Sequence, residues 1–136
     1  YYARLKEYVK RINNSNIYFT GQIKFDEILA FYELANVFLC MSEHEGFCVP
    51  IVESMYFDVP VVARDTSAIA WTMGGSGLLL PDNDPIIAAE MVNRVLADEA
   101  LKEKILKNQR IRLQDFDNQK VKTQFLQIID KIIQGK

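Results

Sequence analysis

Short apolar runs alternate with amphipathic segments along this chain, and this alternation limits the fold more than any other feature. Predicted strands occupy the nearly continuous apolar runs at residues 17–19, 37–41, 59–63 and 78–80. Such strands are typical of parallel sheets that are buried on both faces. Right-handed crossovers place a helix over each face in turn, so the sequence predicts an α/β fold with a parallel sheet and helices on both faces.

Apolar residues at helical spacing predict the elements between and after these strands. Helices are expected at residues 1–12, 25–35, 50–56 and 66–73, and further helices follow residue 84. Pro50 suits the first turn of its helix, where a missing backbone N–H costs nothing. Asp84 directly precedes Pro85, so we interpret it as a helix N-cap rather than as part of a metal-binding acidic triplet.

Length, charge and cysteine content narrow the class of protein. The 136 residues are 49% hydrophobic and 25% charged, as expected of one globular domain spanning residues 1–136. A net charge of −2 provides no field that would attract nucleic acid. Cys40 and Cys48 are interpreted as free thiols of a cytoplasmic protein, and no apolar run reaches the roughly 18 residues of a transmembrane helix. Helical spacing from the first residue suggests a fragment of a longer protein.

The loop after the 37–41 strand holds the best candidates for chemistry. Ligands of open parallel sheets bind beyond the carboxyl ends of the strands, where this loop lies. Gly46 allows the backbone to approach a ligand, and the N-terminus of the next helix carries about half a positive charge, which favours a phosphate. Glu53 lies about one turn inside that helix and leans back toward its start. Glu45 and Glu53 are therefore expected to flank a site for an anion and for paired hydroxyl groups.

These residues form a motif that resembles the glutamate-x7-glutamate signature of family 4 glycosyltransferases, the glycosyl transferases group 1. The residues that carry the likeness are Ser42, Glu45, Gly46, Phe47, Pro50, Glu53 and the run at 59–62. A weaker likeness extends from residues 19–21 to residues 77–81. The resemblance implies the Rossmann-like, donor-binding, C-terminal half of a GT-B architecture, in a retaining hexosyltransferase that builds polysaccharides or glycoconjugates.

The resemblance also implies roles for individual residues. Glu45 would face the donor sugar near its reacting carbon as the catalytic residue, and Glu53 would hold the ribose hydroxyls. The backbone amides expected to contact the sugar or the phosphates belong to Gly46, Phe47 and Cys48. By position, the nucleobase would lie near Gly21 and Lys24, although Lys24 is as well explained as a solvated lysine at a helix start.

The same resemblance implies the partners of the enzyme. They are a nucleotide diphospho-sugar and an N-terminal domain of the same enzyme, and no metal cofactor is expected. The basic residues that neutralise the diphosphate in the family lie upstream of the motif and have no visible counterpart. A basic stretch at residues 102–112 allows peripheral membrane association of the full-length enzyme, although a solvated helix face is the simpler interpretation.

Two further side chains can each be interpreted in two ways. His44 is either a catalytic base or donor contact, or a solvated loop histidine. Trp71 stands where relatives commonly carry the second residue of a Pro-Glu pair, and it either borders the donor cleft or packs at the domain edge. A zinc site of Cys40, His44 and Cys48 is rejected, because Cys40 lies in an apolar strand.

Two other functions remain open from the sequence. A sugar-nucleotide epimerase or a phosphorylase could use the same architecture. A non-catalytic Rossmann-like nucleotide-binding module is the alternative of a different class, and a receiver-type signalling domain is disfavoured because the acidic cluster at the first strand end is missing.

Overall fold

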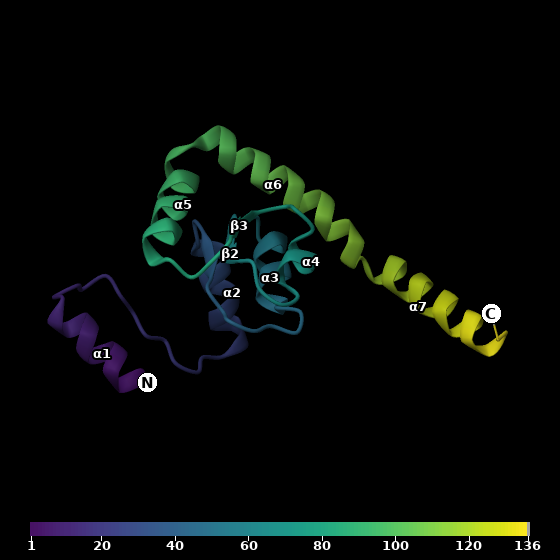
Figure 1. Cartoon of the computed structure of the whole chain (residues 1–136), viewed down its shortest axis with the longest axis horizontal. Coiled ribbons are helices and arrows are strands. Elements are labelled where there is room, and N and C mark those ends of the chain that lie inside the picture. Colours follow the sequence, from purple (N-terminus) through teal and green to yellow (C-terminus); the bar gives the residue numbers. More distant parts are fainter. Residues whose placement is uncertain (136) are drawn as a thin grey trace. The chain divides into compact units, whose positions relative to one another are not determined.

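The computed structural model describes residues 1–135 and separates into two compact units. Unit 1 is Tyr1–Ala30, and unit 2 begins at Phe31. Helix α1 (Tyr2–Arg11) lies in unit 1, whereas helix α2 (Phe25–Leu34) begins in unit 1 and ends in unit 2 (Figure 1). The expectation of one domain over residues 1–136 stays a prediction.

Unit 1 confirms one element of the sequence analysis and corrects another. The helix expected at residues 1–12 forms as α1, but residues 17–19 form no strand. Unit 1, all of whose residues the structure describes, contains no strand with which this run could pair. Phe19 instead packs edge-to-face with Tyr2, with 5.5 Å between ring centroids and 86° between planes, and Tyr18 is 82% exposed. An unpaired strand leaves its backbone groups without partners, so apolar composition alone does not produce one.

Unit 2 is built on a three-stranded parallel sheet in the order β1-β2-β3. The strands are β1 (Phe38–Cys40), β2 (Val61–Arg64) and β3 (Leu78–Leu80). Phe38 pairs with Val61, and Val62 pairs with Leu78. The parallel sheet and the α/β class predicted from the sequence are therefore confirmed.

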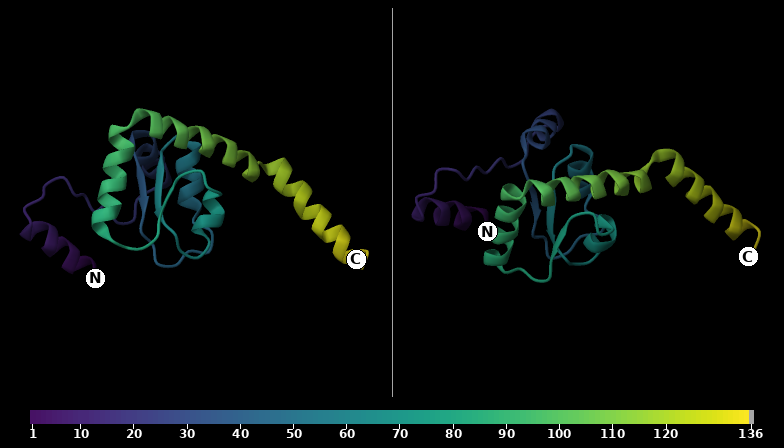
Figure 2. Two further views of the ribbon diagram at one scale, coloured as in Figure 1. Left: turned by 45° about the horizontal axis from the view of Figure 1, so that its top comes forward. Right: turned by 90° about the horizontal axis from the view of Figure 1, so that it is seen from above.

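Helices of unit 2 cover both faces of this sheet. They are α3 (Val49–Tyr56), α4 (Ile69–Met73), α5 (Pro85–Ala97) and α6 (Glu99–Leu113). A short 3-10 helix η1 (Gln114–Phe116) and α7 (Asn118–Ile133) continue the chain beyond α6 (Figure 1). Figure 2 shows the sheet between α5 on one side and α3 with α4 on the other. The prediction of helices on both faces is confirmed.

Alternation along β2 divides the core into two clusters. Val61 and Ala63 face α3 and α4 and pack in the cluster that contains Ile51 and Met55, whereas Val62 faces the opposite cluster. The opposite cluster also contains Leu80, Ala88, Val95 and Ile105. Each fully buried aliphatic side chain contributes about 1.5–3 kcal/mol, so both layers hold the strand ends in place.

The start of β2 is fixed by a side chain from α6. Gln109 is fully buried; its Oε1 accepts a hydrogen bond from the Val61 N–H at 3.0 Å, and its Nε2 donates to the Val59 carbonyl at 2.9 Å. Pro60 has no N–H to contribute to a ladder. The strand expected at residues 59–63 therefore runs from Val61 to Arg64, because the backbone before it is bonded to a side chain.

Two helix starts follow from local side-chain chemistry. Asp84 Oδ1 accepts a hydrogen bond from the Ile86 N–H at 2.8 Å, which confirms Asp84 as the N-cap of α5. Helix α4 begins at Ile69 instead of residue 66, since Ser67 adopts a positive φ of 48° and Thr66 bonds to another loop.

Candidate functional site

The loop at residues 41–48 joins the end of β1 to the start of α3, at the carboxyl edge of the sheet. Glu45 is half-buried in this loop, and its carboxylate lies within 4.8 Å of the thiols of Cys40 and Cys48. Gly46 is exposed, does not adopt a positive φ, and would accommodate a Cβ without any contact within 4 Å. The backbone at Gly46 therefore faces open space, as a ligand-binding position requires.

The residues after β2 hold this loop in position. Thr66 Oγ1 donates a hydrogen bond to the Glu43 carbonyl at 2.7 Å, and Ser67 Oγ lies 2.9 Å from His44 Nδ1. His44 is exposed, so it is a loop histidine with one protein partner and a second ring nitrogen that no hydrogen bond of the described residues uses. The two strand-end loops form one connected surface, as expected for a site at the edge of a parallel sheet.

Glu53 is held by a residue that the sequence analysis assigned only to the apolar stripe of α2. Tyr32 Oη donates a hydrogen bond to Glu53 Oε2 at 2.9 Å. The Tyr32 ring stacks on Phe57 with 5.5 Å between centroids and 9° between planes. Burial, followed by the bond to Glu53, raises the pKa of the Tyr32 phenol. Tyr32 therefore stays a hydrogen-bond donor, which fixes one carboxylate oxygen and leaves Glu53 Oε1 for a ligand.

Trp71 lies beside the same loop. Its indole is 65% exposed and tilted against Phe47, with 6.1 Å between ring centroids. Thr72, the next residue, donates a 2.6 Å hydrogen bond from Oγ1 to the Phe47 carbonyl. The structure thus brings Trp71 to the Glu45 loop rather than burying it at a distant edge.

Arg112 of α6 contacts both the ring and the backbone of Trp71. The sequence analysis did not select it as a site residue. Its guanidinium lies 5.3 Å from the Trp71 ring centroid and 4.8 Å from that of Phe116. It also donates hydrogen bonds to the carbonyls of Trp71 and Thr72 at 2.6 and 3.1 Å. A Cβ at Gly74 would lie 2.7 Å from Arg112 Nε, so the small residue is required for this contact.

Cys48 precedes α3 in a left-handed conformation, with φ of 62°. An N-cap residue normally bonds the first turn with its side chain, but Cys48 makes no such bond. Its thiol points inward, 3.9 Å from the Cys40 thiol. Burial, then the neighbouring Cys40, raises the pKa of the Cys48 thiol to about 12, so this thiol at the helix start is protonated at neutral pH.

Arg64 supplies a cation at the carboxyl end of β2. Its Nη1 lies 3.8 Å from Glu43 Oε1, is buried and makes no hydrogen bond within the described residues. The sequence analysis did not select Arg64, although a charged residue ending an apolar strand is the signal that could have found it. Its positive charge lies close to the Glu43 carboxylate and adds to the local field at this strand end.

Gly21 and Lys24 lie in unit 1, and the structure does not place them relative to Glu45. Gly21 adopts a φ of 65°, and the Lys24 N–H donates to Glu27 Oε2 at 2.8 Å at the start of α2. Both geometries are local turn and capping features. Their proposed role beside the nucleobase stays a prediction.

The rejected combination of Cys40, His44 and Cys48 does not assemble among residues 1–135. The group whose ligand atoms lie within 4.8 Å of one another is Cys40, Glu45 and Cys48. His44 instead contacts Ser67. The residue that joins the two thiols is thus the candidate catalytic glutamate.

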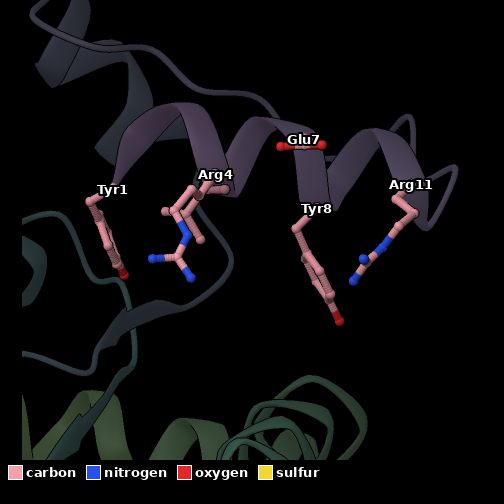
Figure 3. Close-up of a pocket in the computed structure, with 6 residues that line it drawn as sticks. Tyr1, Arg4, Glu7, Tyr8 and Arg11 are labelled. Atoms are coloured by element: carbon pink, nitrogen blue, oxygen red, sulfur yellow. The ribbon is translucent and has the colours of Figure 1, made fainter.

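A groove of about 470 Å³ lies along α1 and is distinct from these residues. It is lined by Tyr1, Arg4, Leu5, Glu7, Tyr8 and Arg11. Figure 3 shows the side chains of Tyr1, Arg4, Tyr8 and Arg11 extending to one side of the helix. None of the candidate site residues lines this groove. Within residues 1–135, no helix combines the length and the apolar composition required to cross a membrane.

A parallel α/β sheet with a polar loop and a helix N-terminus at its carboxyl edge is the arrangement in which Rossmann-like domains bind phosphorylated ligands. The family model described as Glycosyl transferases group 1 matches residues 1–112. The chain therefore belongs to the glycosyl transferases group 1.

Relatives of the chain are glycosyltransferases by name. A GalNAc-alpha-(1->4)-GalNAc-alpha-(1->3)-diNAcBac-PP-undecaprenol alpha-1,4-N-acetyl-D-galactosaminyltransferase of Campylobacter jejuni is 27% identical over 93% of this chain and 35% of its own. The O-antigen chain mannosyltransferase B of Escherichia coli is 29% identical over 64% of this chain and 23% of its own. The chain spans about a third or less of the length of these relatives.

A solved structure gives the same assignment. The sucrose-phosphate synthase of Thermosynechococcus elongatus matches 98% of this chain and 35% of its own, with a TM-score of 0.78 and 28% identity. This similarity confirms the Rossmann-like fold of a GT-B enzyme.

Proposed function

We propose that the chain is the donor-binding domain of a retaining glycosyltransferase, which transfers a hexose from a nucleotide diphospho-sugar to a hydroxyl acceptor. The observation that carries this proposal is the placement of Glu45 and Glu53 before and within α3, beyond the carboxyl end of β1. Membership in the family supports the transfer of a sugar, and the two acids support the way in which the donor is held.

The donor would be bound mainly by electrostatic groups of the loop and of α3. The partial positive charge at the α3 N-terminus favours the diphosphate, with amides of Gly46, Phe47 and Cys48 as donors of hydrogen bonds. Glu53, oriented by Tyr32, accepts from the ribose hydroxyls through its free oxygen. Donor binding of this kind requires no metal ion. Arg64 adds a positive charge at the neighbouring strand end.

Glu45 would act on the reacting sugar. As the bond from the anomeric carbon to the diphosphate breaks, positive charge develops on the sugar ring, and a fixed carboxylate stabilises it. The acceptor oxygen then bonds to the anomeric carbon on the face from which the diphosphate departs, and its proton passes to a diphosphate oxygen. Retention of configuration follows from attachment on that face.

A second domain of the same enzyme would supply the acceptor side. The Campylobacter relative and the sucrose-phosphate synthase are about three times as long as this chain, so the whole enzyme is expected to contain at least one further domain. Helix α7 also exposes an apolar stripe that a partner domain could cover, formed by Val121, Phe125, Ile128 and Ile132. By this proposal the isolated 136-residue chain binds nucleotide weakly and transfers no sugar.

The names of the relatives support the donor and acceptor classes. N-acetylgalactosamine and mannose transferases point to a hexose donor. The Campylobacter relative acts, by its name, on a PP-undecaprenol-linked glycan, which supports peripheral association of the full-length enzyme with the cytoplasmic face of a membrane. The exposed Lys104 and Lys107 of α6 would then face anionic lipid.

A donor screen with the full-length protein tests this proposal. Nucleotide diphospho-sugars are supplied with and without oligosaccharide or lipid-linked acceptors, and free nucleoside diphosphate and the anomeric configuration of the product are measured. The proposal expects nucleotide release that requires an acceptor, with the donor's configuration retained. An epimerised nucleotide sugar formed without acceptor would indicate the epimerase alternative instead.

A further inference from the structure

Two buried thiols and one carboxylate lie close together where β1 meets the proposed donor loop. Cys40 is the last residue of β1, and Cys48 immediately precedes α3. Each is 7% exposed. The ligand atoms of Cys40, Cys48 and the half-buried Glu45 all lie within 4.8 Å of one another.

The separation of the sulfurs matches metal coordination better than a disulfide. The two Sγ atoms lie 3.9 Å apart, whereas a disulfide bond is about 2 Å long. Tetrahedral Zn²⁺ with Zn–S bonds of about 2.3 Å places two sulfurs about 3.8 Å apart. A pair of thiolates selects thiophilic ions such as Zn²⁺ and Cd²⁺ over Mg²⁺ or Ca²⁺.

The surroundings leave room for a complete coordination shell. Ser42 Oγ lies 3.6 Å from Cys40 Sγ and can bond to a coordinated sulfur or to a water in the fourth position. Cys48 uses its side chain toward Cys40 instead of capping α3, so the inward thiol has no other structural task in the helix start. Glu45 is partly exposed and provides the route from solvent.

We propose that Cys40, Cys48 and Glu45 form a binding site for a thiophilic divalent cation, and that occupation of this site inhibits sugar transfer. The inhibitory part rests on the proposed role of Glu45, because a carboxylate that coordinates a metal ion cannot stabilise charge on the donor sugar. The binding part rests on the three side chains alone.

When the cation binds, it replaces the protons of the cysteine thiols. Both free thiols bind the ion as thiolates, so coordination releases the protons that they carry. Affinity therefore increases as pH rises through the neutral range.

The binding is tested with Cd²⁺ as the probe, added to the whole chain in the presence of a phosphine reductant. We expect one ion per chain and a thiolate-to-metal charge-transfer band in the ultraviolet. Loss of a supporting group around a metal costs about 10–100-fold in affinity, so Glu45→Gln should weaken binding by at least about tenfold. Cys40→Ala should abolish the band, and His44→Ala, which removes a nearby residue outside the cluster, should leave the affinity unchanged.

Failure of this inference is distinguishable from failure of the proposed function. Absence of a saturable band, or an equal band in Cys40→Ala, would overturn the site whatever the enzyme does. In the full-length enzyme, Zn²⁺ should inhibit transfer by the wild type but not by Cys40→Ala, because Cys40 has no role in donor binding. Saturation with Zn²⁺ without any loss of transfer would overturn the inhibitory role. Glu45→Gln changes a half-buried side chain to one of nearly the same size, so its result does not depend on the stability of the cysteine variants.

Discussion

By the proposed function, the hydrogen bond from Tyr32 to Glu53 orients the carboxylate that binds the donor and takes no part in the transfer step. Tyr32→Phe keeps the ring stacked on Phe57 and removes only the donor to Glu53. A hydrogen bond to a charged group contributes about 1.5–3 kcal/mol, and partial exposure places this one near the lower value. We expect the dissociation constant of the donor to rise about tenfold, with kcat nearly unchanged.

Calorimetric titration of the nucleotide sugar and steady-state kinetics check this expectation. Tyr56→Phe is the matched control, because Tyr56 is 74% exposed and its hydroxyl has no partner among the described residues. Equal donor affinity in Tyr32→Phe and Tyr56→Phe would contradict a positioning role for Tyr32.

Trp71 offers an optical reporter of the site, since it is the only tryptophan of the chain. Its exposed indole contacts Phe47, so a bound nucleotide sugar should change its fluorescence. Trp71→Phe in the full-length protein should remove that change, and Trp71→Ala should weaken donor or acceptor binding more than it lowers the free energy of unfolding. An identical ligand-induced difference in wild type and Trp71→Phe would place Trp71 outside the site.

The raised pKa of Cys48 predicts that the free energy of unfolding decreases at alkaline pH. Its pKa is raised from 9.0 to about 12 in the folded chain, so the stabilisation is complete below pH 9 and is lost as pH rises toward 12. Cys48→Ala keeps a non-glycine residue at the positive φ and removes the titrating thiol. Urea unfolding from pH 8 to pH 11 should show a shallower decline in Cys48→Ala; parallel declines would contradict the raised pKa.

At the scale of elements, α6 determines where β2 begins. Gln109→Leu would leave the Val61 N–H and the Val59 carbonyl buried without partners. Each unsatisfied backbone group costs about 1–3 kcal/mol, so the free energy of unfolding should fall by about 2–4 kcal/mol. Gln114→Leu, at an exposed glutamine, is the control. A loss below about 0.5 kcal/mol in Gln109→Leu, measured by urea unfolding, would contradict this role.

Local patterns predicted most elements but not the contacts that fix their ends. Continuous apolar runs gave three strands correctly, because a buried strand must be apolar on both faces. The run at residues 17–19 has the same composition but no strand beside it in unit 1. Pairing depends on distant parts of a chain, which composition does not encode.

For the candidate site, too, the sequence predicted local positions but not the contacts between distant residues. The motif located Glu45 and Glu53 at a strand end and a helix start, since sequence neighbours stay neighbours there. Tyr32 and Arg112 were missed, because they reach the site from 21 and 41 residues away through side-chain contacts. An apolar stripe marks Tyr32 only as a buried residue, and a basic run marks Arg112 only as a solvated one.

At the scale of the whole molecule, the proposed function assigns donor binding to this chain and acceptor binding to another part of the enzyme. It spans 35% of the Campylobacter relative, and the exposed stripe of α7 is suited to packing against a further domain. Transfer is therefore expected only from the full-length protein. Residue roles in catalysis must be measured in that context.

The central claim is that Glu53 binds the nucleotide and Glu45 serves the transfer step. The most direct test measures the donor dissociation constant by calorimetry and the transfer rate by product analysis, in full-length Glu45→Gln and Glu53→Gln. A charged hydrogen bond of about 1.5–3 kcal/mol corresponds to roughly ten- to a hundredfold in either constant. We expect Glu53→Gln to weaken donor binding and Glu45→Gln to slow transfer at saturating donor. Wild-type donor affinity and wild-type turnover in both variants would contradict the site.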